Sequence, residues 1–307
     1  MSGDEATRLE KLLDDGWGYH DTESERLARE LEAAAAHGVA SNVLAPFLHL
    51  VTHTIGEHLD DWPRALRLGE RVVVAQTPGP ETARAWGRLY VAAVLAGNAV
   101  EAADLELTYL KAAGDDVGAT MLDMRFMLIA GLVGSKRAGE AAHLYRSALD
   151  LVGQIQQSAQ LHRTIAVASN NLGWELYETR ARTADEDTLM RLCAETSLEF
   201  WRKCGNWINT ERAHYLGTVV ANVTGDPTSG LAHADAALAI IAANGERPLD
   251  TALLQLARAV SLGALGDADG HARAIFDADA AAATLVAKDL KAQFLAERTR
   301  VLASSTM

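Results

Sequence analysis

A recurring pattern of apolar and small residues constrains the fold of this chain more than any other feature. The clearest copy runs from Ala166 to Glu178 and has the dipeptide Leu172-Gly173 at its centre. Weaker copies recur in the same phase, about 37 to 44 residues apart. The six copies are centred on Thr52, Leu89, Leu128, Leu172, Leu216 and Leu256. Each interval is long enough for two helices and two turns, so we expect a series of helical hairpins.

Close packing of two antiparallel helices explains the pattern. A small residue on the first helix and an alanine on the second allow the two backbones to approach, while larger side chains fill the space between hairpins. Alanines about twelve residues after the first three marks, Ala65, Ala102 and Ala141, fit this role. The matching second helices are expected around residues 61–73, 100–105 and 138–149.

The copy at Ala166–Glu178 resembles the first helix of a tetratricopeptide (TPR) repeat, whose regular length is about 34 residues. The longer and uneven spacing resembles the degenerate repeats of bacterial signalling and regulatory proteins. The resemblance implies an all-α fold, a right-handed α-solenoid of about six antiparallel helix pairs with helical caps at both ends. We expect a single domain over residues 1–307, with capping helices in 1–45, six repeats in 46–278 and a capping helix in 279–307.

Turn and cap residues predict where several helices begin and end. We expect a first helix over residues 4–15, and a capping box in which Thr22 and Glu25 begin the second. Later signals predict a helix from Pro46 to Leu59, a loop at 77–80, a long helix over 158–179, a loop over 180–187 and one final helix over 279–303.

Composition limits the class of protein. The 307 residues are 49% hydrophobic and 22% charged, which favours a folded chain, and six prolines allow helix throughout. We count no run of 18 apolar residues and no hydrophobic N-terminal segment, so we expect no membrane span, no signal peptide and a cytoplasmic location. The formal charge of −13 argues against nucleic acid and favours a neutral to basic protein or peptide partner.

Cys193 and Cys204, about 16 Å apart along one helix, are expected to be reduced packing thiols.

Motifs that would indicate catalysis are missing from the sequence. There is no nucleophile elbow, phosphate-binding loop, dinucleotide-binding glycine pattern or zinc-protease motif. His49, His53 and Glu57 share a helical face at a spacing that suits a metal, but no third protein ligand can be placed beside the imidazoles. We therefore expect neighbouring groups to satisfy these histidines, and we assign no metal, cofactor or catalytic residue.

The resemblance also implies a binding surface, because the first helices of TPR repeats line a concave groove. The residues carried over to that groove are Phe47, Leu50, Arg84, Phe126, Asn170, Trp174, Tyr177, Glu211, His214, Asn222 and Arg258. Trp174 and Tyr177 are the candidate anchors, and Asn170 and Asn222 can pair with a peptide backbone. In a tightly wound solenoid, the same aromatic residues would instead fill the interior.

These observations favour a non-catalytic adaptor or scaffold that holds a peptide or protein segment in the concave groove. The groove lacks the Lys, Asn and Arg set of the TPR proteins that clamp chaperone C-termini. One alternative is a ligand- or peptide-sensing regulatory domain, which would need a closed pocket around Asn170, Trp174, His214 and Arg258. Another is an enzyme on a helical scaffold, which would need several titratable groups in one cleft.

Overall fold

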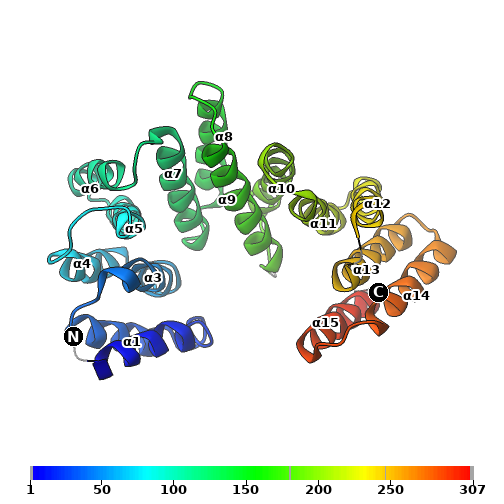
Figure 1. Ribbon diagram of the computed structural model, residues 1–307, viewed down its shortest axis with the longest axis horizontal. Coiled ribbons are helices and arrows are strands. Elements are labelled where there is room, and N and C mark those ends of the chain that lie inside the picture. The colour runs from blue at the N-terminus through cyan, green and yellow to red at the C-terminus, as the bar shows by residue number, and fades with distance from the viewer. Residues whose placement is uncertain (1–2, 180, 246, 305–307) are drawn as a thin grey trace. The chain divides into compact units, whose positions relative to one another are not determined.

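A computed structural model describes residues 3–179, 181–245 and 247–304 (Figure 1). Within these ranges the chain forms fifteen α-helices and one π-helical segment and has no strand, which confirms the all-α prediction. The chain divides into two compact units, Met1–Leu161 (unit 1) and His162–Met307 (unit 2). The single six-repeat solenoid over residues 1–307 stays a prediction.

Unit 1 is built from consecutive helical hairpins. Its elements are α1 (Gly3–Gly16), α2 (Ser24–Ala35), α3 (Ser41–Val51), the π-helix η1 (Thr52–His58), α4 (Trp62–Val73), α5 (Ala83–Leu95), α6 (Ala99–Ala112), α7 (Val117–Gly134), α8 (Ala138–Val152) and the first turn of α9 (Ala159–Glu178). The alternate helices α3, α5 and α7 contact one another as well as their hairpin partners. Fully buried side chains such as Leu48, Ile129 and Tyr145 form the core between them.

Unit 2 contains most of α9 and six further helices. These are α10 (Ala184–Cys204), α11 (Trp207–Val223), α12 (Pro227–Asn244), α13 (Pro248–Ala264), α14 (Ala268–Ala283) and α15 (Lys288–Ser304). Consecutive helices from α10 to α14 pack together, and α13 also contacts α11 and α15. Leu256, Phe294 and Val301 belong to a buried cluster that joins α13, α14 and α15.

Glycines permit the close helix contacts that the repeat pattern requires. A Cβ atom on Gly69 would lie 2.2 Å from Leu89 Cδ2, and one on Gly87 would lie 2.4 Å from Met127 Cε. In unit 2, a Cβ atom on Gly173 would lie 3.0 Å from Leu216 Cδ2. The absence of a side chain at these positions therefore sets how closely adjacent helices approach.

Most of the predicted helices are present, but two predicted boundaries are wrong. The helix expected to begin at Pro46 begins at Ser41, because Leu44 already lies in the core, and the exposed Pro46 is inside α3. The single final helix expected over 279–303 is broken between α14 and α15. The chain turns there so that Leu285 enters the same buried cluster as Phe294.

The capping box expected at Thr22 and Glu25 is also wrong. Helix α2 begins after Glu23, whose side chain makes no capping hydrogen bond, and the Thr22 hydroxyl donates instead to the Tyr19 carbonyl at 3.5 Å. A complete capping box forms at Thr183 and Glu186, where the threonine hydroxyl accepts from the Glu186 backbone N–H. It starts α10 at Ala184, so the loop expected over 180–187 is shorter than predicted; Arg180 lies outside the described residues.

One described helix, α7, is long and apolar enough to cross a membrane by length and composition, with a mean hydropathy of 1.5. The sequence-based count of apolar runs overlooked it because Asp123 and Arg125 interrupt the stretch. Of this helix, 61% is buried inside the structure, and the core helix of a soluble protein passes the same test.

Candidate functional site

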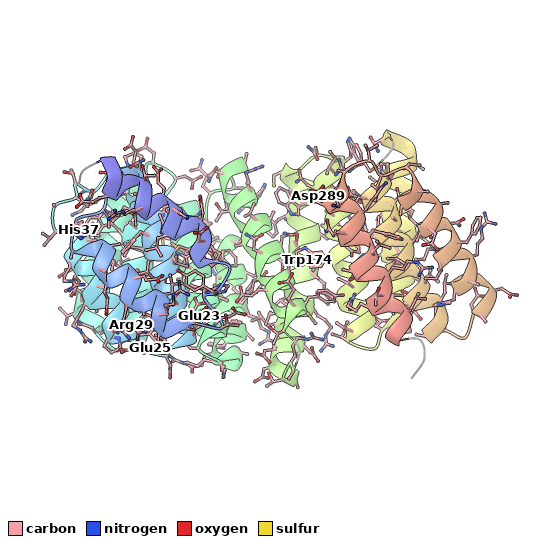
Figure 2. The ribbon with its side chains drawn as sticks, turned by 90° about the horizontal axis from the view of Figure 1, so that it is seen from below. Glu23, Glu25, Arg29, His37, Trp174 and Asp289 are labelled. Atoms are coloured by element: carbon pink, nitrogen blue, oxygen red, sulfur yellow. The ribbon has the colours of Figure 1, made fainter. Side chains whose placement is uncertain are left out.

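The candidate site is a pocket of about 1130 Å³ within unit 2. Alternate helices α9, α11, α13 and α15 supply its walls, through residues that include Trp174, Tyr215, Asp250 and Arg300. The Trp174 side chain on α9 is labelled in Figure 2. All of the lining residues belong to unit 2, so the pocket lies within that unit.

Three aromatic side chains form one wall of the pocket. The Trp174 ring makes an edge contact with Tyr177, at 5.5 Å between ring centroids, and a tilted contact with Tyr215 at 5.4 Å. Burial raises the pKa of the Tyr215 phenol above its ordinary value, and the nearby Glu297 carboxylate raises it further. Both phenols stay neutral at ordinary pH, so this wall offers broad apolar surface with hydroxyl groups at its edges.

Arg300 connects the last helix of the unit to the first. Its guanidinium donates a hydrogen bond to the Tyr177 hydroxyl and lies 5.4 Å from the centroid of the Tyr177 ring. The same guanidinium is paired with the Glu297 carboxylate at 2.5 Å. These contacts bridge α15 and α9 and narrow the pocket on that side.

Charged groups of both signs line the pocket, and most of them are paired. Asp250 accepts a hydrogen bond from Arg247 and lies 3.6 Å from the Arg212 guanidinium. Arg182 pairs with Asp187 at 2.7 Å and donates to the Tyr177 carbonyl at 3.1 Å. The pocket is therefore polar at its rim without a large local excess of one charge.

Glu211 is a buried acid beside this charged group. Its side chain is fully buried, and neither carboxyl oxygen has a hydrogen-bond partner among the described residues. Burial raises its pKa to about 8, and the nearby Asp250 carboxylate adds to the shift. The Arg212 guanidinium, 3.8 Å away, opposes this shift, so Glu211 is largely protonated at neutral pH.

Three of the residues assigned to the groove from the sequence line this pocket together: Asn170, Trp174 and Tyr177. The four in unit 1 lie elsewhere. Phe47 and Leu50 are fully buried in the core, and Phe126 packs edge to face against Tyr145. Arg84 is exposed and pairs with Asp123 at 3.2 Å.

The remaining predicted groove residues of unit 2 are engaged with neighbouring helices. His214 Nδ1 lies 2.9 Å from His233 Nδ1, and burial, followed by the His233 charge, lowers the pKa of His214 to about 4. The Asn222 amide donates to the Ala257 carbonyl at 2.8 Å, and Arg258 pairs with Asp235 at 2.7 Å. A pocket shared by Asn170, Trp174, His214 and Arg258 does not form among the described residues, since only the first two line the cavity.

Sequence reasoning missed several residues that complete the pocket: Tyr215, Asp250, Glu297 and Arg300. Tyr215 directly follows the predicted His214, so a shift of one position along the helix would have found it. Arg300 belongs to the helix predicted to be the C-terminal cap. If that helix is instead taken as the first helix of a further repeat, Arg300 falls on the groove side.

Of the three side chains whose spacing suggested a metal, His53 and Glu57 are in contact and His49 packs elsewhere. His53 Nδ1 hydrogen-bonds to the Glu57 carboxylate, as a spacing of four residues allows. His49 packs its ring edge against Trp17, at 5.1 Å between centroids. Burial, with a smaller contribution from the Arg88 charge, lowers the pKa of His49 to about 3, so this side chain is a neutral packing residue.

Both cysteines lie on α10, as predicted, and neither is in a disulfide. Burial raises the pKa of the Cys204 thiol, which argues for a packing role. The TPR resemblance rests on the repeat pattern of the sequence. The chain matches no known protein-family profile and no curated protein sequence.

Proposed function

We propose that this chain is a non-catalytic, TPR-like adaptor or scaffold of the cytoplasm, and that unit 2 binds a segment of a protein partner in its pocket. The observation that carries the proposal is the lining of one 1130 Å³ pocket by alternate helices, with Asn170, Trp174 and Tyr177 together on α9. Alternate helices are the ones that line the groove of a TPR array. The six-repeat, right-handed arrangement over residues 46–278 belongs to the same proposal.

The pocket offers separate chemistry for the side chains and for the backbone of a peptide. Trp174 and Tyr215 supply apolar contact area, and the Asn170 amide can donate to and accept from a peptide backbone. Acidic and basic residues are balanced in the pocket lining, so the preference for a basic peptide rests on the chain's formal charge of −13. We therefore propose a neutral to basic peptide as the ligand.

Selection from a random peptide display library, followed by titration of the selected peptides, tests this proposal. The variant carries both Trp174→Ala and Asn170→Ala, and the control is Arg84→Ala, which alters a predicted groove residue of unit 1. We expect the double variant to bind the selected peptides at least tenfold more weakly and the control to match the unaltered chain. Equal binding by all three proteins, or a library that yields no peptide, contradicts the proposal.

A second candidate function, sensing of a small molecule, is favoured by the Arg300–Tyr177 contact that narrows the pocket. A thermal-shift screen with metabolites and peptides separates the two candidates, because a ligand that binds only the native state raises the melting temperature. For a small ligand we expect Arg300→Ala to abolish the shift by widening the pocket. For a peptide that enters from the open side, we expect the shift to persist.

A further inference from the structure

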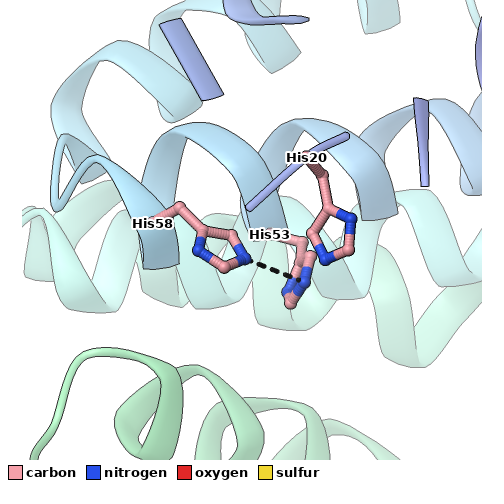
Figure 3. Close-up of side chains that lie close together, drawn as sticks. All are labelled: His20, His53 and His58. Carbon is pink, nitrogen blue, oxygen red and sulfur yellow. Dashed lines mark hydrogen bonds between the residues drawn. The ribbon is translucent and has the colours of Figure 1, made fainter. Parts of the chain in front are cut away.

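Three histidines meet in unit 1. In the sequence they are far from every residue that lines the pocket of unit 2. His20 lies in the turn between α1 and α2, and His53 and His58 lie in the π-helix η1. One ring nitrogen of each lies within 4.8 Å of the other two. Figure 3 shows the three imidazole rings gathered beside η1. Two separate parts of the chain thus bring strong metal-binding groups to one place.

The π-helix explains why His53 and His58 share a face. Residues five apart in an α-helix are separated by about 140° around the axis, because each residue turns by about 100°. A π-helix hydrogen-bonds to the fifth residue and turns less per residue, which brings such residues onto the same side of the axis. The bond from the Leu59 N–H to the Thr54 carbonyl, at 3.2 Å, has this spacing. π-Helix is rare in proteins, and the single turns that do occur are frequently found at functional sites.

Hydrogen bonds hold Nδ1 of two of the three rings, which leaves their Nε2 atoms for a metal. His53 Nε2 lies 3.3 Å from His58 Nε2, in a hydrogen bond that an ion bound to both nitrogens would replace. His53 Nδ1 is bound to the Glu57 carboxylate, and His20 Nδ1 lies 2.8 Å from the Trp17 carbonyl oxygen. Both oxygens only accept, so each Nδ1 carries the proton and each Nε2 presents a lone pair. A carboxylate or carbonyl that holds the far side of an imidazole is typical of metal-binding histidines.

Packing holds the Glu57 carboxylate in position beside His53. The Glu57 side chain is only 10% exposed and packs against the backbone of Gly134 on α7, where a Cβ atom would lie 2.5 Å from Glu57 Cγ. A glycine at this position leaves the room that Glu57 occupies. Glu57 also offsets the positive charge that an ion would bring beside three neutral imidazoles.

The spacing of one pair of nitrogens fits a tetrahedral ion, and the His20 ring, whose nitrogen lies within 4.8 Å of both, would move towards an ion bound there. His53 Nε2 and His58 Nε2 are 3.3 Å apart. Two nitrogens bound to zinc at about 2.0 to 2.1 Å with tetrahedral angles are separated by about 3.3 to 3.4 Å. Nitrogen ligands of the imidazole type suit zinc, copper, nickel and iron, and three of them leave a fourth position for water or another molecule.

We propose that His20, His53 and His58 bind one divalent transition-metal ion, with zinc as the first candidate, through their Nε2 atoms, and that Glu57 positions His53. His58 is exposed, so the fourth coordination position faces solvent on its side of the cluster. His49 does not belong to the ligand set, since its ring centroid lies 6.4 Å from that of His53 and its ring packs on Trp17.

Zinc titration of the chelator-treated full chain tests the proposal, with bound metal measured by elemental analysis after dialysis. We expect one zinc ion per chain. His20→Gln, His53→Gln and His58→Gln should each weaken binding at least tenfold, and Glu57→Gln should weaken it by roughly 10- to 100-fold. His143→Gln, which replaces an exposed histidine on α8, should leave binding unchanged.

Cobalt substitution gives a second readout, because tetrahedral coordination gives cobalt a visible absorption that is much more intense, and at longer wavelength, than that of hydrated cobalt. We expect this absorption in the unaltered chain and in His143→Gln, and its loss in His20→Gln, whose residue lies in a turn and does not form part of a helix. Circular dichroism checks that each variant is folded. Zinc binding that is absent, or that persists equally in the three histidine variants, overturns the proposal.

Discussion

Glu211 shows how one buried side chain contributes to the pH dependence of unit 2. Its pKa is raised to about 8 in the folded chain, chiefly by burial, while in the unfolded chain it is near 4.5. Between these values the folded state holds a proton that the unfolded state has lost. Stability is therefore fully present below pH 4.5 and falls as pH rises towards 8, by up to about 1.4 kcal/mol per pH unit.

Glu211→Gln should remove this dependence, because the amide has nearly the same shape and never ionises. We expect a higher melting temperature than that of the unaltered chain at pH 8, and a flatter dependence of melting temperature on pH between 5 and 8. Glu199→Gln on α10 is the matched control, since that side chain is 61% exposed and pairs with the exposed Lys203. If the slope of the Glu211→Gln variant matches that of the control, Glu211 is ionised in the folded chain.

At the scale of the element, η1 depends on the absence of a side chain at Gly56. A Cβ atom there would lie 2.5 Å from Trp62 Cζ3, and the Trp62 ring is held in place by a hydrogen bond from its Nε1 to Ser135 Oγ at 2.9 Å. Gly56→Ala should therefore destabilise the chain by about 1 to 3 kcal/mol in urea unfolding, despite the better helix propensity of alanine. Gly79→Ala, in a loop where a Cβ atom meets nothing within 4 Å, should change stability by less than about 0.5 kcal/mol.

The two candidate capping boxes give a second test at this scale. Thr183 caps α10 through reciprocal bonds with Glu186, whereas Thr22 makes no capping bond to α2. Thr183→Ala should cost about 1 kcal/mol of unfolding free energy, and Thr22→Ala should cost less than about 0.5 kcal/mol. Hydrogen exchange of the first turn of α10 should accelerate in the first variant alone. Equal losses in both variants would show that the cap at Thr183 contributes nothing.

The sequence predicts elements better than it predicts sites, for a physical reason. Helix existence follows from local spacing, so the helix over 158–179 was predicted almost to the residue, and the loop predicted at 77–80 lies inside a longer connection between α4 and α5. The pocket depends on contacts between distant parts of the chain, such as Tyr177 with Arg300, 123 positions apart. The histidine cluster depends on η1, because an α-helix would have turned His58 away from His53. The TPR resemblance assigns Phe47 and Leu50 to the groove, but both lie in the core, because a motif position alone does not distinguish a groove face from a core face.

At the scale of the whole molecule, 41 acidic residues outnumber 28 Lys and Arg residues, which gives the formal charge of −13. Near the pocket the charges are mostly paired, as Arg182 is with Asp187 and Arg300 with Glu297. For the proposed basic peptide, we therefore expect attraction to come mainly from the long-range field of the chain, and retention to come from contacts inside the pocket. These two contributions respond differently to salt, because exposed charges are screened beyond about 10 Å at 0.1 M salt.

For the basic peptides selected by display, we expect the association rate constant to fall at least severalfold between about 0.05 and 0.5 M salt. The dissociation rate constant should change much less, because buried aromatic contacts are not screened. Surface plasmon resonance on the full chain measures both. A peptide whose lysines are replaced by norleucine serves as control and should associate more slowly and with little salt dependence. If salt changes only the dissociation rate constant, the essential charge pairs between peptide and protein lie inside the pocket. The variants Asp250→Asn and Glu178→Gln would then identify them.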